Sequence, residues 1–255
     1  MQQRLKNFIK SIIGQSAIDR VLGQSNEERD LTVLSAEDRE LINRIRKKNI
    51  TYLSNRKLAC LVTTCRLIER SNLPGVFLEA GCALGGSSIL LASLKSVERP
   101  LFIYDAFGMI PPPTEDDTKD VHDRYRVIVE GKSQGLGGDK YYGYEENLYE
   151  TVQYNLREFD INCEKESVSL VKGLVQETMK IDQPVAFAHI DVDWYEPVMT
   201  CLERIFPKLV TGGSIILDDY HDWGGCRKAA DEYLKKVAGQ FILDDSAGSM
   251  KVTRK

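Results

Sequence analysis

The chain has 255 residues, of which 42% are hydrophobic and 28% are charged, so it can bury a full core and is large enough to be an enzyme. Its formal net charge of -4 gives no reason to expect nucleic acid or an anionic membrane as the main partner, because basic patches usually bind these partners. No apolar run approaches the ~18 residues that a membrane span needs. We therefore expect a soluble protein that acts on a small molecule.

The cysteines indicate the compartment. They show no C-x-x-C spacing, and we recognise no signal peptide before them. This pattern favours reduced, mostly buried thiols in a cytoplasmic protein over a disulfide framework or a zinc site. The six cysteines are Cys60, Cys65, Cys82, Cys163, Cys201 and Cys226.

Residues 1–50 are expected to form a helical extension before a domain of residues 51–255. Apolar residues at helical spacing in residues 1–22 predict a short amphipathic helix that packs on the domain or on a second subunit. A membrane-surface helix is the alternative, and we expect a homo-oligomer. The charged run 36–49 predicts an exposed helix, and Thr51–Ser71 predicts a more amphipathic one.

A glycine-rich turn follows the first expected strand of the core, Val76–Ala80. Gly81 and Gly85 lie in this turn, and the apolar helix Ser87–Leu94 comes directly after it. A strand, a glycine turn and a helix N-terminus form a cradle in which backbone can approach a ligand closely. We expect the glycines Gly81 and Gly85 to contact a cofactor.

A second expected strand, Leu101–Tyr104, ends at Asp105. Asp105 lies some 20 residues beyond Gly85, the distance at which a carboxylate on the next strand can bind ribose hydroxyls, so we expect a nucleoside-type site. The dinucleotide fingerprint G-x-G-x-x-G is absent, and Glu79 precedes the glycine turn. A glutamate there would repel a pyrophosphate but attract a cationic ligand, which favours S-adenosylmethionine over a nicotinamide dinucleotide.

Residues 107–144 combine three prolines, an acidic patch and a glycine-rich stretch. A structureless run of this length inside a compact domain is usually a functional lid or a disordered insertion, and we favour a lid or substrate loop. Its tyrosines could face a ring-bearing substrate or solvent: Tyr141, Tyr142 and Tyr144.

Two apolar runs in residues 186–220 each end in a pair of carboxylates. Such runs are typical of buried parallel strands, whose carboxyl ends meet at one edge of a sheet where ligands bind. A divalent metal ion would explain the crowding of like charges there, although strand-end ion pairs and helix caps are alternatives. The four carboxylates belong to Asp191, Asp193, Asp218 and Asp219.

The other expected elements complete an α/β pattern. Helices are expected at Glu145–Phe159, Leu174–Met179 and Arg227–Val237, a strand at Val168–Val171, and a terminal hairpin at residues 241–253. We predict a doubly wound, mostly parallel sheet.

Several motifs in this order resemble the macrocin O-methyltransferase-like family, whose metal-dependent members methylate sugar hydroxyls on macrolide and aminocoumarin antibiotics. The resemblance runs from about Thr51 to the C-terminus, and residues 116–143 depart from the pattern, so the acceptor is not predicted. The motifs are FLEAGCALGGSS, YDAFGMIP, VKGLVQETM, HIDVDWYEP and FPKLVTGGSIILDDYHDWGGCRKA.

The resemblance implies a class I methyltransferase fold with a reversed last strand, S-adenosylmethionine as methyl donor and Mg²⁺ as metal. It makes Asp191, Asp218 and Asp219 the metal ligands and Asp193 the general base. It places the remaining contacts on the cofactor, with Glu79, Gly81 and Ser87 at the amino-acid end, Asp105 at the ribose, and Gly173 and Gln176 at the adenine.

Aromatic and histidine side chains next to the carboxylates are candidates for the acceptor site. Trp194, Tyr195 and Trp223 could wall the acceptor or simply pack, and His221 is an alternative base or substrate contact. We expect His189 to be a packed strand residue. The activity expected is methylation of a hydroxyl of a sugar or glycosylated natural product; the alternatives are a nicotinamide-dependent oxidoreductase and a non-catalytic protein of the same fold.

Overall fold

The computed structural model describes residues 30–255, in which seven strands form one sheet in the order β3-β2-β1-β4-β5-β7-β6. The first five strands of this order are parallel, β7 runs antiparallel to β5, and β6 runs antiparallel to β7. The predicted doubly wound, mostly parallel sheet with a reversed last strand is confirmed. The strands are β1 (Val76–Ala80), β2 (Leu101–Asp105), β3 (Val168–Lys172), β4 (Val185–Ile190), β5 (Leu209–Leu217), β6 (Phe241–Asp244) and β7 (Met250–Arg254).

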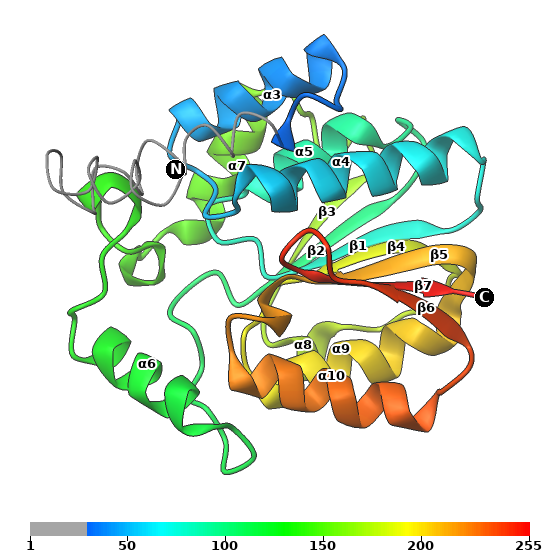
Figure 1. The fold of residues 1–255 in the computed structure, drawn as a ribbon. Coiled ribbons are helices and arrows are strands. Elements are labelled where there is room, and N and C mark those ends of the chain that lie inside the picture. Colours follow the sequence, from blue (N-terminus) through cyan, green and yellow to red (C-terminus); the bar gives the residue numbers. More distant parts are fainter. Residues whose placement is uncertain (1–29) are drawn as a thin grey trace, which may run out of the picture.

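Helices cover both faces of the sheet (Figure 1). Phe187 on β4 belongs to the hydrophobic core on one face and its neighbour Ala188 to the core on the other, because side chains alternate along a strand. Burial on both faces explains why these strands are mostly apolar along their whole length. One face carries α3 (Ala36–Lys47), α4 (Asn55–Arg70), α5 (Gly86–Leu94) and α7 (Leu148–Glu158), and the other carries α8 (Val175–Thr178), α9 (Tyr195–Ile205) and α10 (Gly224–Lys236).

The α3 helix is more buried than its charge density predicts. Ile42 and Ile45 are fully buried in the core shared with α4 and α5, so the expectation of an exposed helix is wrong. The two isoleucines lie on one side of the helix together with Asp38, which is buried against Arg66, and most of the other charged residues lie on the exposed side. The amphipathic helix predicted within residues 1–22 lies outside the described residues, and the division of the chain at residue 50 stays a prediction.

Residues 107–144 are not structureless. They contain α6 (Lys119–Val129), which stands apart from both helical layers in Figure 1, and two short 3-10 turns. The Tyr144 hydroxyl donates to the carbonyl oxygen of Ile128 at 2.6 Å and accepts from the amide of Ser133 at 3.2 Å, which ties the end of α6 to the second turn. The segment therefore has its own secondary structure.

The strand order reverses at β1, which lies between β2 and β4. In the sheet register, Ala80 at the end of β1 pairs with Tyr104 on β2 and with Ile190 on β4, and Ile190 pairs with Leu217 on β5. The residues that follow these strands therefore lie at one edge of the sheet, where open α/β sheets bind ligands. None of the helices in the described part of the chain is long and apolar enough to cross a membrane.

Candidate active site

A cavity of about 580 Å³ opens at this sheet edge, within the usual size of a small-molecule site. Its floor is made by the ends of β1 to β5, and residues 104–142 contribute to its wall. The predicted site residues that line it are Gly81, Asp105, Tyr141, Tyr142, Gly173, Gln176, Asp191, Asp193, Trp194, Asp218, Asp219 and Trp223.

Gly81 is required where the chain leaves β1. Its φ is +83°, and a Cβ added there would overlap the backbone carbonyl of Asp191, so only glycine lets the loops after β1 and β4 touch. Gly85 also has a left-handed backbone, but a Cβ there would meet Val152 on α7 at 3.1 Å. Neither Gly85 nor the buried Ser87 lines the cavity, so the structure places these two predicted cofactor residues in the packing beneath it.

Asp105 joins the loops that follow β1 and β2. Its carboxylate accepts hydrogen bonds from the backbone amide of Cys82 at 2.7 Å and from that of Phe107 at 2.6 Å. Burial raises the pKa of this carboxyl group, and the amide donors act in the opposite direction. A carboxylate can accept about four hydrogen bonds, so capacity remains for ribose hydroxyls in the cavity.

Glu79 does not reach the cavity. It is fully buried in β1, opposite His189 in the register of β4, where its carboxylate bonds the Nδ1 atom of His189 at 3.1 Å and accepts from the Ser88 hydroxyl. The structure therefore places Glu79 inside the sheet rather than on the lining of the cavity, and its repulsion of a pyrophosphate no longer speaks against a dinucleotide. Packing of His189 is confirmed; burial lowers its pKa, but Asp218 and Glu79 outweigh this effect and raise it to about 10.

Three carboxylates meet at the floor. Each of Asp191, Asp193 and Asp219 offers an oxygen atom within 4.8 Å of the other two. Burial, followed by the neighbouring Asp218, raises the pKa of Asp191 to about 8, and burial raises that of Asp193 to about 6. The pKa of Asp219 is also raised by burial and by the nearby carboxylates. These shifts come first from removing the carboxylates from water and then from the negative charge of neighbouring carboxylates.

The chemistry of this cluster fits a divalent cation. The Oδ2 atom of Asp219 is buried and has no hydrogen-bond partner within the protein, and the donor set consists of hard oxygen ligands, which suit Mg²⁺. Asp193 has a φ of +56°, an uncommon conformation for a non-glycine residue and one that clusters at functional sites. The residues present therefore fit a divalent ion.

Asp218 has a different environment from its neighbour Asp219. Its Oδ2 atom lies 2.8 Å from the ammonium group of Lys57 on α4, and its Oδ1 atom lies 3.9 Å from the Nε2 atom of His189. Burial raises the pKa of Asp218, but these partners outweigh burial and hold it below its ordinary value. The structure thus brings two of the predicted metal ligands, Asp191 and Asp219, together with the predicted base, Asp193. The third predicted ligand, Asp218, pairs with Lys57 instead.

The aromatic candidates are divided between the cavity and the surface. Trp194 and Trp223 line the cavity with their ring centroids 6.0 Å apart, and the indole of Trp194 donates to the carbonyl oxygen of Pro111 at 3.0 Å. Tyr195 faces α10 instead, where its hydroxyl donates to Glu232 at 2.6 Å. His221 lies 3.7 Å from Asp245 at the surface. Neither Tyr195 nor His221 lines the cavity, so the structure does not support their predicted contacts with substrate.

The structure adds an aromatic group with one cation above the floor. The rings of Tyr141 and Tyr142 have centroids 4.5 Å apart, Tyr52 lies 5.7 Å from Tyr142, and the Arg124 guanidinium lies 5.6 Å from the Tyr141 ring. All four side chains line the cavity, whereas Tyr144 does not. Tyr52 and Arg124 were not predicted as site residues from the sequence, because no local pattern connects them to the site. Asp222 was also missed, although its position three residues after Asp219 was a usable signal.

The strand order and the position of the cavity are those of a Rossmann-like methyltransferase fold. The O-methyltransferase NovP superposes with a TM-score of 0.67 at 23% identity, covering 81% of this chain and 82% of that chain. The SAH-bound methyltransferase PaMTH1 of Podospora anserina superposes with a TM-score of 0.56 at 13% identity, covering 95% and 97%. At these identities, the two solved structures establish the fold.

The chain belongs to the Macrocin-O-methyltransferase (TylF) family, whose model matches residues 13–242. The family match therefore begins well before residue 51, where the motif resemblance was expected to start. Demethyldecarbamoylnovobiocin O-methyltransferase of Streptomyces niveus is 29% identical over 70% of this chain, and Mycinamicin III 3''-O-methyltransferase of Micromonospora griseorubida is 27% identical over 70%. The matched part spans 66% of the length of the first relative and 68% of the second.

Proposed function

We propose that this protein is an S-adenosylmethionine- and Mg²⁺-dependent O-methyltransferase that methylates a hydroxyl of a sugar or of a glycosylated natural product. The observation that carries the proposal is the meeting of Asp191, Asp193 and Asp219 in a cavity whose floor also includes Gly81 and Asp105. Family membership supports methyl transfer to oxygen, and the names of the curated relatives support a glycosylated acceptor. A cytoplasmic location and a homo-oligomeric state stay predictions.

The cofactor side of the proposed site is the part of the floor formed by β1, β2 and β3. Gly81 allows backbone to approach the ligand, Asp105 accepts hydrogen bonds from ribose hydroxyls, and Gly173 and Gln176 lie where the adenine is expected. The structural relative PaMTH1 was solved with SAH bound, which supports the same cofactor here. All four residues line one continuous cavity with the carboxylates.

The metal would be held by Asp191 and Asp219, with Asp193 beside them. A bound Mg²⁺ supplies positive charge that lowers the pKa of an alcohol and offsets the repulsion among the carboxylates. The free Oδ2 atom of Asp219 offers a buried lone pair for this purpose. The protein's own contribution is to hold these oxygen atoms at fixed positions on the ends of two buried strands.

Asp193 is the proposed general base. Burial raises its pKa to about 6, so its carboxylate is ionised at neutral pH yet basic enough to take a proton. Bound S-adenosylmethionine would supply the methyl group, which the acceptor oxygen would take as the bond from carbon to sulfur breaks and S-adenosylhomocysteine is released. Asp193 would accept the hydroxyl proton of the acceptor.

The aromatic side chains that line the cavity orient the acceptor. Trp194 and Trp223 lie on one side of the carboxylates, and Tyr141 and Tyr142 lie on the cavity wall above them. Flat apolar faces of this kind pack on sugar or aromatic rings and exclude water. Holding the hydroxyl in line with the methyl group supplies several kcal/mol of the rate acceleration by itself.

Calorimetry with S-adenosylhomocysteine and with NAD tests the cofactor, and a methyl-transfer screen over glycosylated and catechol-like acceptors tests the reaction. We expect binding of S-adenosylhomocysteine and none of NAD. Binding of NAD alone would reject the proposal in favour of an oxidoreductase. Cofactor binding without turnover on any acceptor, together with unchanged biological activity in Asp193→Ala, would indicate a non-catalytic protein.

A further inference from the structure

Lys57 reaches the carboxylate floor from α4, 161 residues away from its main partner in the sequence. Its ammonium group lies 2.8 Å from the Oδ2 atom and 3.1 Å from the backbone oxygen of Asp218, and 2.7 Å from the Oδ2 atom of Asp222. An ammonium group has three N–H donors, so these three acceptors use all of them. Lys57 therefore binds the turn that follows β5 at three points.

The carboxylates of the floor form two groups that share Asp219. In the first group, Asp191, Asp193 and Asp219 offer oxygen atoms within 4.8 Å of one another, and in the second, Asp218, Asp219 and Asp222 do the same. The Lys57 ammonium forms ion pairs with two carboxylates of the second group, Asp218 and Asp222. No lysine or arginine forms an ion pair with the first group in the described part of the chain.

We propose that Lys57 is the resident cation of the second group and takes the place that a second divalent ion would otherwise fill. The protein therefore binds one divalent ion, at the first group. This inference rests on the proposed metal-dependent function, and it assigns to Lys57 a positioning role for the carboxylate floor. Lysine suits this place because its ammonium is a compact point charge, whereas an arginine fork would need more room.

The physical reason is charge balance. Five carboxylates lie at this edge of the sheet, and two of them follow each other directly in the chain, at positions 218 and 219. The side chain of Lys57 is 14% exposed and that of Asp218 is 7% exposed, so water screens this pair poorly and the ion pair is strong. Once Lys57 neutralises Asp218, the Asp219 carboxylate remains for the first group.

The test counts Mn²⁺ ions per chain by equilibrium dialysis in three proteins: wild type, Lys57→Met, and Lys57→Met combined with Asp222→Asn. We expect one ion in wild type, two in Lys57→Met and one in the double variant. The double variant lacks the Asp222 carboxylate, so the site that Lys57 leaves has lost one of its ligands. The side chain of Asp222 is 53% exposed, so its change to asparagine is compatible with folding. The only two tryptophans of the chain, Trp194 and Trp223, line the cavity, and quenching of their fluorescence by Mn²⁺ gives an independent titration.

An unchanged count in Lys57→Met overturns the inference, whether the affinity for the single ion rises or falls. If wild type binds no Mn²⁺ ion and Lys57→Met binds one, Lys57 does occupy a cation site at the second group. The same result rejects the metal site of the proposed function. Counts of one and two without methyl transfer from S-adenosylmethionine leave the inference standing and reject the proposed reaction. The two claims can therefore fail separately.

Removing Lys57 leaves the buried Asp218 carboxylate uncompensated, which destabilises the fold. A second measurement therefore uses the wild-type protein: acylation of Lys57, followed by mass spectrometry, with and without saturating Mn²⁺. If Lys57 and the ion have separate places, the labelling rate of Lys57 stays the same within twofold. A rate that rises severalfold with Mn²⁺ means that the ion displaces Lys57 from Asp218, and this overturns the inference.

Discussion

The floor of the cavity and the cover formed by residues 107–144 are held in different ways. The floor consists of the ends of buried strands, where Ile190 on β4 and Leu217 on β5 are level in the sheet. The cover is held by side chains on helix N-termini: Asp117 accepts from the backbone amide of Tyr195 at 2.8 Å, and Asp120 accepts from that of Gly224 at 2.9 Å. These carboxylates satisfy free amides at the starts of α9 and α10.

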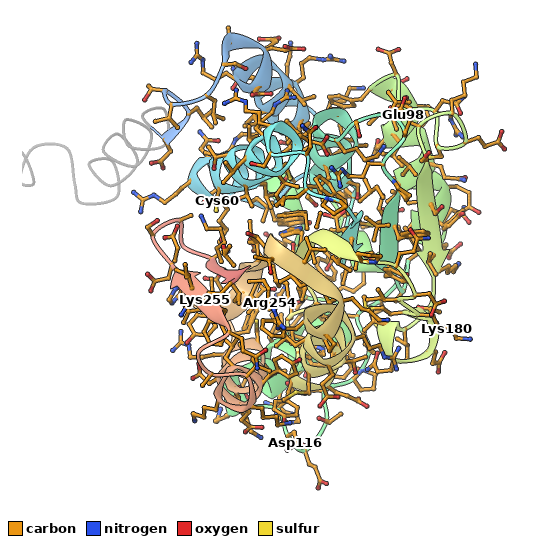
Figure 2. All side chains as sticks on the ribbon, turned by 90° about the vertical axis from the view of Figure 1, so that its right-hand side faces the viewer. Cys60, Glu98, Asp116, Lys180, Arg254 and Lys255 are labelled. Carbon is orange, nitrogen blue, oxygen red and sulfur yellow. The ribbon has the colours of Figure 1, made fainter. Side chains whose placement is uncertain are left out.

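The docking surface for the cover is built for close approach. A Cβ added at Gly224 would overlap the hydroxyl of Thr118, and one added at Gly225 would overlap the carboxylate of Asp117. At the outer end, Asp116 lies at the surface, as Figure 2 shows, and its backbone and side-chain oxygen atoms accept hydrogen bonds from the ammonium group of Lys228. The floor is thus made by the core strands, whereas the cover is attached by polar contacts and by a few buried apolar side chains such as Phe107 and Val121. We expect changes in the floor to affect chemistry and changes in the cover to affect acceptor binding.

The largest effect is expected at Asp193 in the floor. Changing Asp193 to asparagine removes the proposed base and should lower kcat about 10²- to 10⁴-fold, the usual contribution of a general base. Affinity for S-adenosylhomocysteine, measured by calorimetry, should stay the same. His221→Asn is the matched control, since His221 lies outside the cavity, and it should keep normal turnover. Turnover of Asp193→Asn within threefold of wild type would remove Asp193 from the mechanism.

Gly81→Ala should be the next most damaging change. Its left-handed backbone alone costs about 1–3 kcal/mol with alanine, and the added Cβ also overlaps the Asp191 carbonyl. We expect a lower Tm and loss of S-adenosylhomocysteine binding. Gly131→Ala, in the cover, is the control: Gly131 also has a positive φ, of +72°, but open space around it. Normal ligand binding in Gly81→Ala would show that the close contact between the two loops is dispensable.

A smaller effect is expected at the attachment of the cover. Asp117→Ala removes a helix cap worth about 1 kcal/mol. If that energy holds the cover in place over the acceptor, KM for the acceptor should rise roughly fivefold, since 1.4 kcal/mol corresponds to tenfold, while affinity for the cofactor stays unchanged. Asp123→Ala on α6, which changes only surface ion pairs, should behave like wild type. Equal KM values for the two variants would mean that the cap at α9 does not control acceptor binding.

The smallest effect concerns pH. Burial raises the pKa of Asp191 to about 8 and that of Asp193 to about 6, so between about pH 4 and pH 8 the folded protein binds protons that the unfolded chain has released. Stability of the metal-free protein should therefore fall as pH rises through this range. His189, whose pKa is raised to about 10, acts in the same direction above pH 6.5.

Added Mg²⁺ replaces the protons at the carboxylates and should offset this loss. The increase in Tm that Mg²⁺ produces, measured by scanning calorimetry, should accordingly be larger at pH 8 than at pH 6. An equal or larger increase at pH 6 would mean that the ion does not bind at the buried carboxylates.

The floor could be predicted from the sequence because burial on both faces leaves a direct signal. The runs that became β4 and β5 are mostly apolar, with His189 inside the first and Ser214 inside the second, and carboxylates follow both runs, so their common edge followed from strand geometry alone. The role of Glu79 could not be predicted. Its pairing with His189 depends on the register between β1 and β4, which neither strand reveals by itself.

The cover and Lys57 were beyond prediction for other reasons. Prolines and glycines dominate residues 107–144, and α6 buries only Val121 and Ile128, which is too weak a pattern to predict a helix. Lys57 lies at the start of a helix whose apolar face was recognised, but its contact with Asp218 exists only once α4 packs against the sheet. Contacts between distant segments carry no local signal.

The central claim is that the carboxylate floor supports methyl transfer from S-adenosylmethionine to a hydroxyl with the help of a divalent ion. The most direct measurement is the transfer of a labelled methyl group to a glycosylated acceptor, made once with Mg²⁺ and once with excess chelator. We predict turnover with Mg²⁺, its loss in chelator and its recovery when Mg²⁺ is restored. Full turnover in excess chelator would contradict the account.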